Sequence, residues 1–299
     1  MFEVLLEVVL PVFIVALLGA VVGWWRDVPV APFSAMALYL LGPALVFDSM
    51  AATDISIGES VKIVGVMVAG YSAVLLAATL WSLGRGHDRS LRAAVALAAT
   101  SPNAGNMGLP VAALAFGDAG LQVAIVNFVV GALIINSGGI VLASMAGGDA
   151  RAALTAPLRY PYLYAAAAGL AVNALDVDLP AAIAVPADAL AAAAIPIMLI
   201  LLGLQLRTVS GAEDLPDTIA VNLGRLLIAP AIAWLVASAI GLDDITRGTL
   251  VVLAAMPVAV FTTILAEEFD AHPRFVAGAV VSTTLASILS LSVLISLVR

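Results

Sequence analysis

Long apolar stretches with few charged residues follow one another along almost the whole chain. An α-helix of roughly 20 apolar residues crosses the hydrocarbon core of a bilayer, where each backbone polar group must find its partner within the protein. The composition agrees, because 63% of the 299 residues are hydrophobic and 11% are charged, against roughly 45–50% and about 25% in soluble domains. The sequence therefore predicts an all-α integral membrane protein.

Polar, glycine and proline clusters divide the chain into ten predicted transmembrane helices, which leave little chain for a soluble domain. The first is interpreted as a transmembrane helix and not as a signal peptide, because Glu3 and Glu7 stand where such a peptide carries positive charge. We expect one membrane domain over residues 1–299, with helices at 2–25, 31–50, 60–83, 91–116, 119–146, 157–175, 183–206, 217–240, 246–268 and 273–298.

Charged residues in the loops predict the orientation of these helices. Eight arginines lie on the side that the chain reaches after the odd-numbered helices, whereas Lys62, Arg247 and Arg299 lie on the other side. Because positively charged loops stay in the cytoplasm, we expect a multi-pass protein of the cell membrane with both termini outside. The 20 acidic residues outnumber the 12 basic ones, which suits an organism that lives in high salt. The lack of a basic patch excludes nucleic acid as a partner.

The two halves of the chain, 1–147 and 148–299, contain five predicted helices each, so they enter the membrane from opposite sides. Proline recurs at matching places in the halves, although shared prolines alone can arise by chance. These are Pro43 in the second helix and Pro196 in the seventh, and Pro102 in the fourth and Pro257 in the ninth. We therefore predict a 5+5 inverted repeat.

The middle of the fourth helix, from Thr100 to Pro110, does not favour a continuous helix. Its two prolines lack backbone donors, and Asn103 and Asn106 place amides at the depth of hydrocarbon. An unwound segment here would line a polar cavity at the bilayer midplane, and the N-terminus of the following half-helix would offer partial positive charge to an anion. The alternative is a proline-kinked structural helix whose asparagines bond neighbouring backbones.

The ninth helix carries Pro257 at a comparable depth, followed by Thr262 and Thr263. We expect it to be interrupted as well and to cross the fourth helix; helix packing is the alternative role for the two hydroxyls. Asn127 in the fifth helix needs a partner inside the bundle. Arg225 in the eighth helix either extends its head group to the cytoplasmic face or forms a structural pairing. The alternative is that it presents a permanent positive charge to a cavity, where it would select anions.

No pattern typical of enzymes is present. The chain has no cysteine and two histidines, and it lacks the HExxH, phosphate-binding and nucleophile-elbow motifs. The cluster of Glu267, Glu268, Asp270 and His272 at a cytoplasmic helix end fits a solvated loop better than a metal site. We therefore expect no catalytic residues, no metal and no cofactor.

Three groups of motifs occur in order along the chain. The fourth helix contains Pro102-Asn103, Met107-Gly108-Leu109-Pro110 and Phe116-Gly117; the eighth contains Arg225 and Pro230; the ninth contains Ala255-Met256-Pro257 and continues through Ala266-Glu267-Glu268-Phe269 to His272-Pro273. In this order and spacing the motifs resemble the auxin efflux carrier family of membrane transporters, which includes plant PIN-type carriers and bacterial and archaeal carriers. The similarity extends over essentially all 299 residues and identifies the chain as a prokaryotic, archaeal relative of the PIN-type carriers.

This resemblance implies an architecture like that of sodium/proton antiporters and bile-acid transporters, in which helices 4 and 9 are broken and cross. The implied transport domain contains helices 3–5 and 8–10, slides like an elevator against a scaffold of helices 1, 2, 6 and 7, and forms a homodimer through that scaffold. Asn103 matches the family's asparagine beside the crossover, Pro110 and Pro257 match its prolines, and Asn127 stands where PIN-type carriers have a polar amide. The third helix offers only Lys62 near its outer end, so a plant-like site with a carboxylate and lysine pair does not carry over.

The leading interpretation is a secondary transporter of a small organic anion: a dicarboxylate, a monocarboxylate or an auxin-like indole acid. A cation/proton antiporter is the alternative, but it would need an acidic residue beside the crossing, and the sequence offers none there. A non-transporting membrane receptor or scaffold protein is the second alternative. The coupling partner stays open between a sodium ion and a proton. The candidate substrate-binding residues are Asn103, Asn106, Pro110, Asn127, Arg225, Pro257, Thr262 and Thr263.

Overall fold

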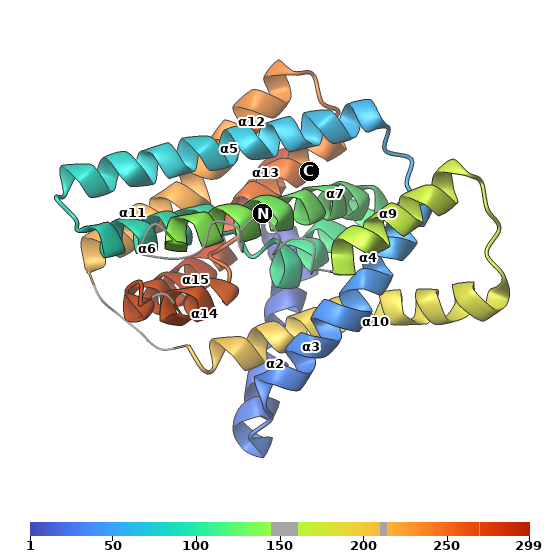
Figure 1. The fold of residues 1–299 in the computed structure, drawn as a ribbon, viewed down its shortest axis with the longest axis horizontal. Helices are drawn as coiled ribbons and strands as arrows, with labels where there is room; N and C mark the ends of the chain where they lie inside the picture. The colour runs from blue at the N-terminus through green and yellow to red at the C-terminus, as the bar shows by residue number, and fades with distance from the viewer. Residues whose placement is uncertain (145–160, 210–213, 269) are drawn as a thin grey trace.

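The computed structural model describes residues 1–144, 161–209, 214–268 and 270–299, and the regular structure in these ranges is helical (Figure 1). Helical segments lie within every predicted range. Those of the first half are α1 (Phe2–Val4), η1 (Leu5–Val9), α2 (Leu10–Arg26), α3 (Val30–Met36), η2 (Ala37–Leu41), α4 (Gly42–Ala51), α5 (Ile57–Gly84), α6 (Arg89–Thr100), η3 (Ala104–Gly108) and α7 (Leu109–Ser144), where η denotes a π-helical segment.

The second half continues in the same way. Its helices are α9 (Pro161–Ala174), α10 (Ala181–Leu206), α11 (Leu215–Leu223), η5 (Gly224–Ile228), α12 (Ala229–Ala239), α13 (Asp244–Ala254), α14 (Phe261–Glu268) and α15 (Pro273–Val298). The helix α7 contains the end of the fourth predicted range and extends into the fifth. Gly117, with φ 66° and ψ −156°, breaks it between the two ranges. Only glycine adopts this conformation readily, so the chain turns there without a loop.

Seven helices among the described residues are long and apolar enough to cross a membrane, which indicates an integral membrane protein. They are Phe2–Arg26, Val30–Ala51, Ile57–Gly84, Ala104–Ala132, Ala181–Leu206, Leu215–Ala239 and Pro273–Val298. The fourth and ninth predicted helices are both interrupted, and α9 is described over 14 residues. None of these three predicted helices is described as one uninterrupted helix of the length that the other seven reach.

The four π-helical segments among the described residues share one cause, which is a proline two residues after the segment ends. The prolines are Pro11, Pro43, Pro110 and Pro230. A proline has no N–H and its ring clashes with the carbonyl of the preceding turn, so the helix widens locally. In each case the residue just before the proline donates its N–H five residues back, as Leu109 does to the carbonyl of Ala104.

Three helix N-termini are fixed by acidic or hydroxyl caps outside the apolar core. Ser56 and Glu59 form a capping box at α5, Asp88 accepts from the N–H of Leu91 at α6, and Asp243 caps α13. The hydrogen bond from the Leu91 N–H lowers the pKa of Asp88. These caps set where the helices begin and therefore the depth of the interruptions that follow.

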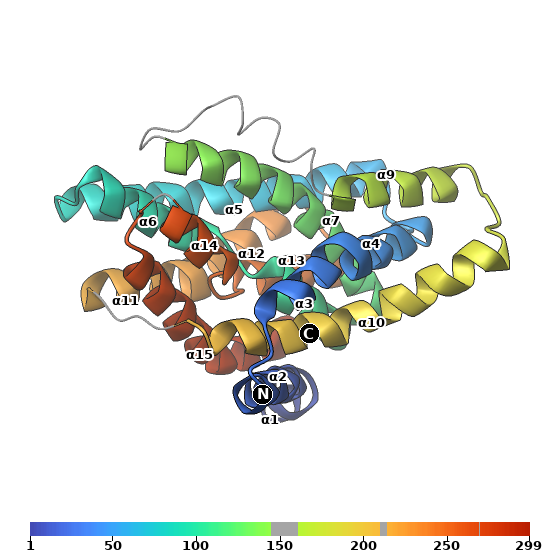
Figure 2. The ribbon, with the colours of Figure 1, turned by 60° about the horizontal axis from the view of Figure 1, so that its bottom comes forward.

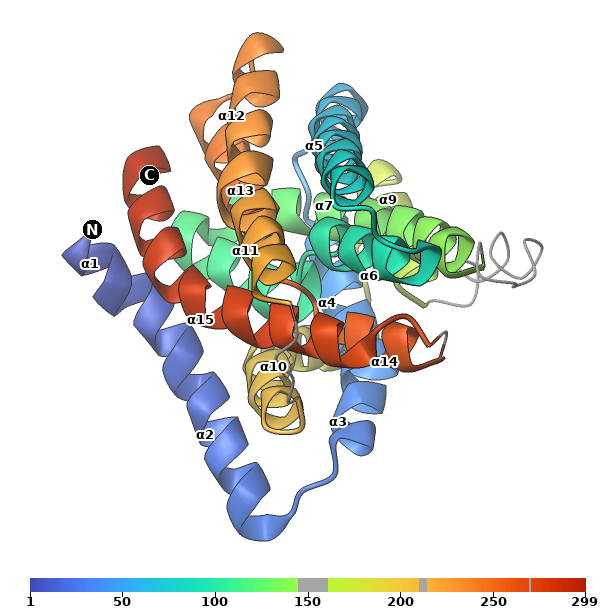
Figure 3. The ribbon, with the colours of Figure 1, turned by 90° about the vertical axis from the view of Figure 1, so that its left-hand side faces the viewer.

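Close backbone packing joins α2 to α10. A side chain at Gly203 would overlap the carbonyl oxygen of Ala16, and one at Gly19 would overlap that of Ile200. Figures 2 and 3 show α2 and α10 next to each other, on the side of the molecule opposite α5. The two chain termini also lie near one another in these views, and Arg299 forms a 4.0 Å ion pair with Glu7.

Candidate functional site

The two interrupted helices cross at their breaks. Residues 101–103 separate α6 from η3, and residues 255–260 separate α13 from α14. The Asn103 N–H donates to the carbonyl of Pro257 at 2.8 Å, and the Ala259 N–H donates to that of Ser101 at 2.9 Å, which forms an antiparallel bridge. Backbone groups freed by the prolines thus satisfy one another, as an apolar interior requires.

Arg225 binds the ends of both half-helices that enter the crossing. It lies in η5 and is 0% exposed. Its Nη1 donates to the carbonyl of Ala99 (3.3 Å), its Nη2 to those of Ala254 (2.9 Å) and Met256 (3.0 Å), and its Nε to Met256 (3.2 Å). The carbonyls of Ala99 and Ala254 belong to the C-terminal ends of α6 and α13, where partial negative charge gathers, and that of Met256 follows α13 by two residues.

Of the alternatives open for Arg225, the structure shows a structural pairing and not an extension to the cytoplasmic face. The carbonyl groups at the crossing give the guanidinium fixed hydrogen-bond partners inside the protein, which the position of Arg225 along its helix did not reveal. Arg225 does line a cavity, but a small one of about 20 Å³ that it shares with Asn127 and Tyr71. Such a space accommodates one water molecule.

A larger cavity of about 340 Å³ lies on the side of the crossing where the outgoing half-helices begin. The first residues of η3 and α14 line it, and helix N-termini carry partial positive charge. Asn103, Asn106 and Thr262 add polar groups to the same wall. Its apolar walls include Leu38, Phe128, Tyr162, Met198 and Leu201.

Neutral groups alone line this cavity, since no acidic or basic side chain among the described residues reaches it. The side chain of Asn103 is 5% exposed, and its Nδ2 has no hydrogen-bond partner in the part of the chain that the structure describes. A buried donor without a partner is costly. The cavity wall therefore combines two positive helix ends with Asn103, whose buried amide donor has no partner among the described residues.

A second amide connects the crossing to α10. The Nδ2 of Asn106 donates to the Oε1 of Gln205 at 3.1 Å, and both residues line the larger cavity. Tyr162 also lines this cavity; it donates to the carbonyl of Ala37 at 3.0 Å and its ring packs edge-on against Phe128. Neither Gln205 nor these aromatic residues were predicted for the site, because Gln205 lies near a helix end and aromatic side chains are common in membrane helices.

The eight predicted site residues divide into three groups. Asn103, Asn106 and Thr262 line the larger cavity, whereas Asn127 and Arg225 line the smaller one. Pro110, Pro257 and Thr263 line neither cavity. The prolines shape the backbone, as described above, and the Thr263 hydroxyl donates to the carbonyl of Val260 at 2.8 Å.

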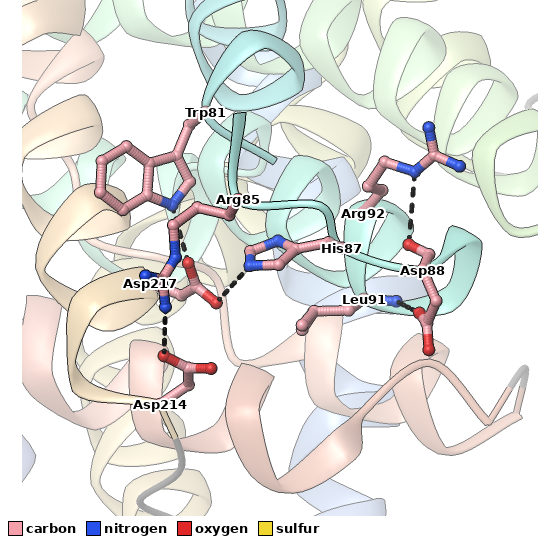
Figure 4. Close-up of polar contacts among 8 residues, drawn as sticks. All are labelled: Trp81, Arg85, His87, Asp88, Leu91, Arg92, Asp214 and Asp217. Carbon is pink, nitrogen blue, oxygen red and sulfur yellow. Dashed lines mark hydrogen bonds and ion pairs between the residues drawn. The ribbon is translucent and has the colours of Figure 1, made fainter. Parts of the chain in front are cut away.

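A buried polar cluster joins the end of α5 to the start of α11 (Figure 4). Trp81 donates its Nε1–H to Asp217 at 2.7 Å, and the Nε2 of His87 lies 3.2 Å from the same carboxylate, which is 0% exposed. Arg85 pairs with Asp214 at 3.7 Å. These partners are more than a hundred positions apart in sequence, so no local pattern predicted the cluster.

The fold and site define an integral membrane protein with two interrupted helices crossing beside a neutral cavity. A family model described as "Membrane transport protein" matches residues 4–157 and 150–295. The chain belongs to this family of multi-pass membrane transporters, the auxin efflux carrier family. It is similar to an uncharacterized transporter of Methanothermobacter thermautotrophicus, with 29% identity over 291 residues that make up 95% of each chain.

Proposed function

We propose that the protein is a secondary transporter that carries a small organic anion across the cell membrane, and that the 340 Å³ cavity holds the anion. The single observation that carries this proposal is the cavity wall at the crossing, where two helix N-termini and Asn103, whose buried amide nitrogen has no partner among the described residues, line a space without a fixed charge. Each helix N-terminus is equivalent to roughly +0.5 elementary charge. Together they match about one carboxylate.

Among the three anion classes that the sequence left open, the lining favours a monocarboxylate with an apolar body. A second carboxylate would have no positive partner among the residues of the cavity, and burying an unpaired charge is expensive. Phe128, Tyr162 and Met198 instead offer apolar contact area. A volume of this size also lies at the lower end of the range for small-molecule sites, which is about 300–1,000 Å³.

The architecture that we propose is a 5+5 inverted repeat of ten transmembrane helices over residues 1–147 and 148–299. The crossing of the fourth and ninth helices at matching prolines supports it. The nearness of the two termini supports an even number of membrane crossings. That both ends lie outside rests on the distribution of arginine among the loops. In this arrangement α9 is the sixth transmembrane helix. The interrupted pair α6 with η3 forms the fourth, and the pair α13 with α14 forms the ninth.

The transport step that we propose is a sliding of one group of helices against the other. The cavity is lined by Tyr162, Met198 and Gln205 together with Asn103 and Thr262. The first three come from the proposed scaffold and the last two from the proposed transport domain. The scaffold is also the proposed homodimer contact, and breaking the hydrogen bond between Asn106 and Gln205 would accompany the movement.

The test is uptake of labelled organic acids into proteoliposomes, with sodium, proton and potential gradients varied separately. We expect saturable uptake of a monocarboxylate that falls strongly in Asn103→Ala and persists in Asn222→Ala. Asn222 is a matched control, because its amide is bonded to the Thr218 carbonyl and the Ser282 hydroxyl outside the cavity. Cation flux without carboxylate uptake would support an antiporter, and binding without flux would support a receptor.

A further inference from the structure

The C-terminal ends of α6 and α13 meet at one buried cation. Each helix C-terminus is equivalent to roughly −0.5 elementary charge, so two together carry about −1. The guanidinium of Arg225 supplies one positive charge and binds three carbonyl oxygens, those of Ala99, Ala254 and Met256. The charges at this point therefore balance without a carboxylate, and none lines the adjoining small cavity among the described residues.

Carbonyl oxygens at broken helix ends are the groups that bind a coupling cation such as sodium in transporters with interrupted helices. Here the same kind of oxygen atoms point at a side chain that cannot lose its charge under ordinary conditions. Arg225 is 0% exposed, and its guanidinium is covalently attached to the protein, so this cation cannot diffuse away. It therefore stands where a freely diffusing cation would otherwise have to bind.

We propose that Arg225 is a positioning residue that fills a monovalent-cation site at the crossing, and that its removal opens this site to sodium. The guanidinium holds the two incoming half-helices together, which fixes the direction of the two outgoing half-helices toward the larger cavity. In the unaltered protein no sodium binds at the crossing. The consequence for transport, which is anion movement without sodium at this position, rests on the proposed function.

Thermal unfolding of the purified full-length protein tests the site without any substrate. Each variant is measured in sodium chloride and in choline chloride at equal ionic strength. We expect no difference between the salts for the unaltered protein and for Arg225→Lys, which keeps the charge. Arg225→Ala is expected to unfold several degrees lower in choline and to recover part of this loss in sodium, with a saturable dependence on sodium concentration. Arg225→Met, which fills the space without a charge, is expected to show the loss but no recovery.

A saturable sodium-dependent rise in the melting temperature of the unaltered protein would overturn the proposal, as would an Arg225→Ala protein that unfolds identically in the two salts. If Arg225→Ala does not yield folded protein, Arg225→Ser, which also leaves the space open, replaces it with the same two expected outcomes. Uptake measurements separate the two levels of the account. If the unaltered protein moves no anion but Arg225→Ala shows the sodium response, the cation-site proposal is supported and the proposed function is refuted.

Discussion

Replacing Asn103 by leucine separates the binding role of this amide from its cost to the fold. The Nδ2 of Asn103 is buried without a partner among the described residues, and such a donor destabilises the folded state by about 1–3 kcal/mol. Leucine has a similar shape and no donor, so Asn103→Leu is expected to raise the free energy of unfolding by up to about that amount. A hydrogen bond to a charged ligand contributes about 1.5–3 kcal/mol, so the apparent affinity for a carboxylate should fall about 10- to 150-fold.

The assay combines thermal unfolding of purified variants with the concentration dependence of uptake into proteoliposomes. Asn222→Leu is the control, because the Asn222 amide is fully engaged at 2.8 Å and 2.9 Å and lies outside the cavity. It should lower the melting temperature and leave the apparent affinity unchanged, the reverse of Asn103→Leu. The reasoning is refuted if Asn103→Leu unfolds at a lower temperature than the unaltered protein, or if its half-saturating concentration does not change.

Three further predictions concern movement, packing and capping. The chain has no cysteine, so in the double variant Asn106→Cys with Gln205→Cys a short thiol crosslinker can join only the two introduced cysteines. The crosslink should stop uptake, and unhindered uptake by the crosslinked protein would contradict the sliding step. Gly203→Val should abolish folded protein, because its side chain would overlap the backbone of α2, whereas Gly65→Ala, with nothing nearby, should be tolerated; size-exclusion chromatography in detergent compares them. Burial raises the pKa of Asp243, but its hydrogen bonds lower it more, so the cap contributes above the unfolded pKa of about 3.9 and is lost as pH falls below it. Asp243→Ala should therefore cost about 1 kcal/mol at neutral pH and nothing in strong acid, and an equal loss in unfolding free energy at both pH values would contradict this.

Much of the helix pattern was predictable from the sequence because lipid imposes a length and an apolar composition on each helix. Polar clusters and prolines marked the boundaries, and the described ends lie within about four residues of the predicted ones. The break near Pro102 was predictable for a local reason, since proline removes a donor and crowds the preceding turn. The four π-helical segments of the described residues were not predicted, although the sequence contains the prolines that cause them.

The candidate site was predictable only where its residues lie beside a break. Asn103, Asn106 and Thr262 follow the prolines in sequence and line the larger cavity. Gln205 and Tyr162 reach the same cavity from distant helices, and only the packing brings them there. The carbonyl partners of Arg225 could not be inferred either, because backbone groups carry no signature in a sequence. The three-dimensional packing determines which end of the crossing binds the Arg225 guanidinium and which end faces the larger cavity.

Uptake of a labelled apolar monocarboxylate by the purified protein in proteoliposomes tests the central claim most directly, with unlabelled acids as competitors. The account predicts saturable uptake that an excess of the same monocarboxylate abolishes and that a dicarboxylate of similar size inhibits far less, because the cavity offers about one positive charge from its two helix ends. Equal inhibition by both acids would contradict the charge match at the crossing. The absence of saturable anion uptake would contradict the proposed function itself.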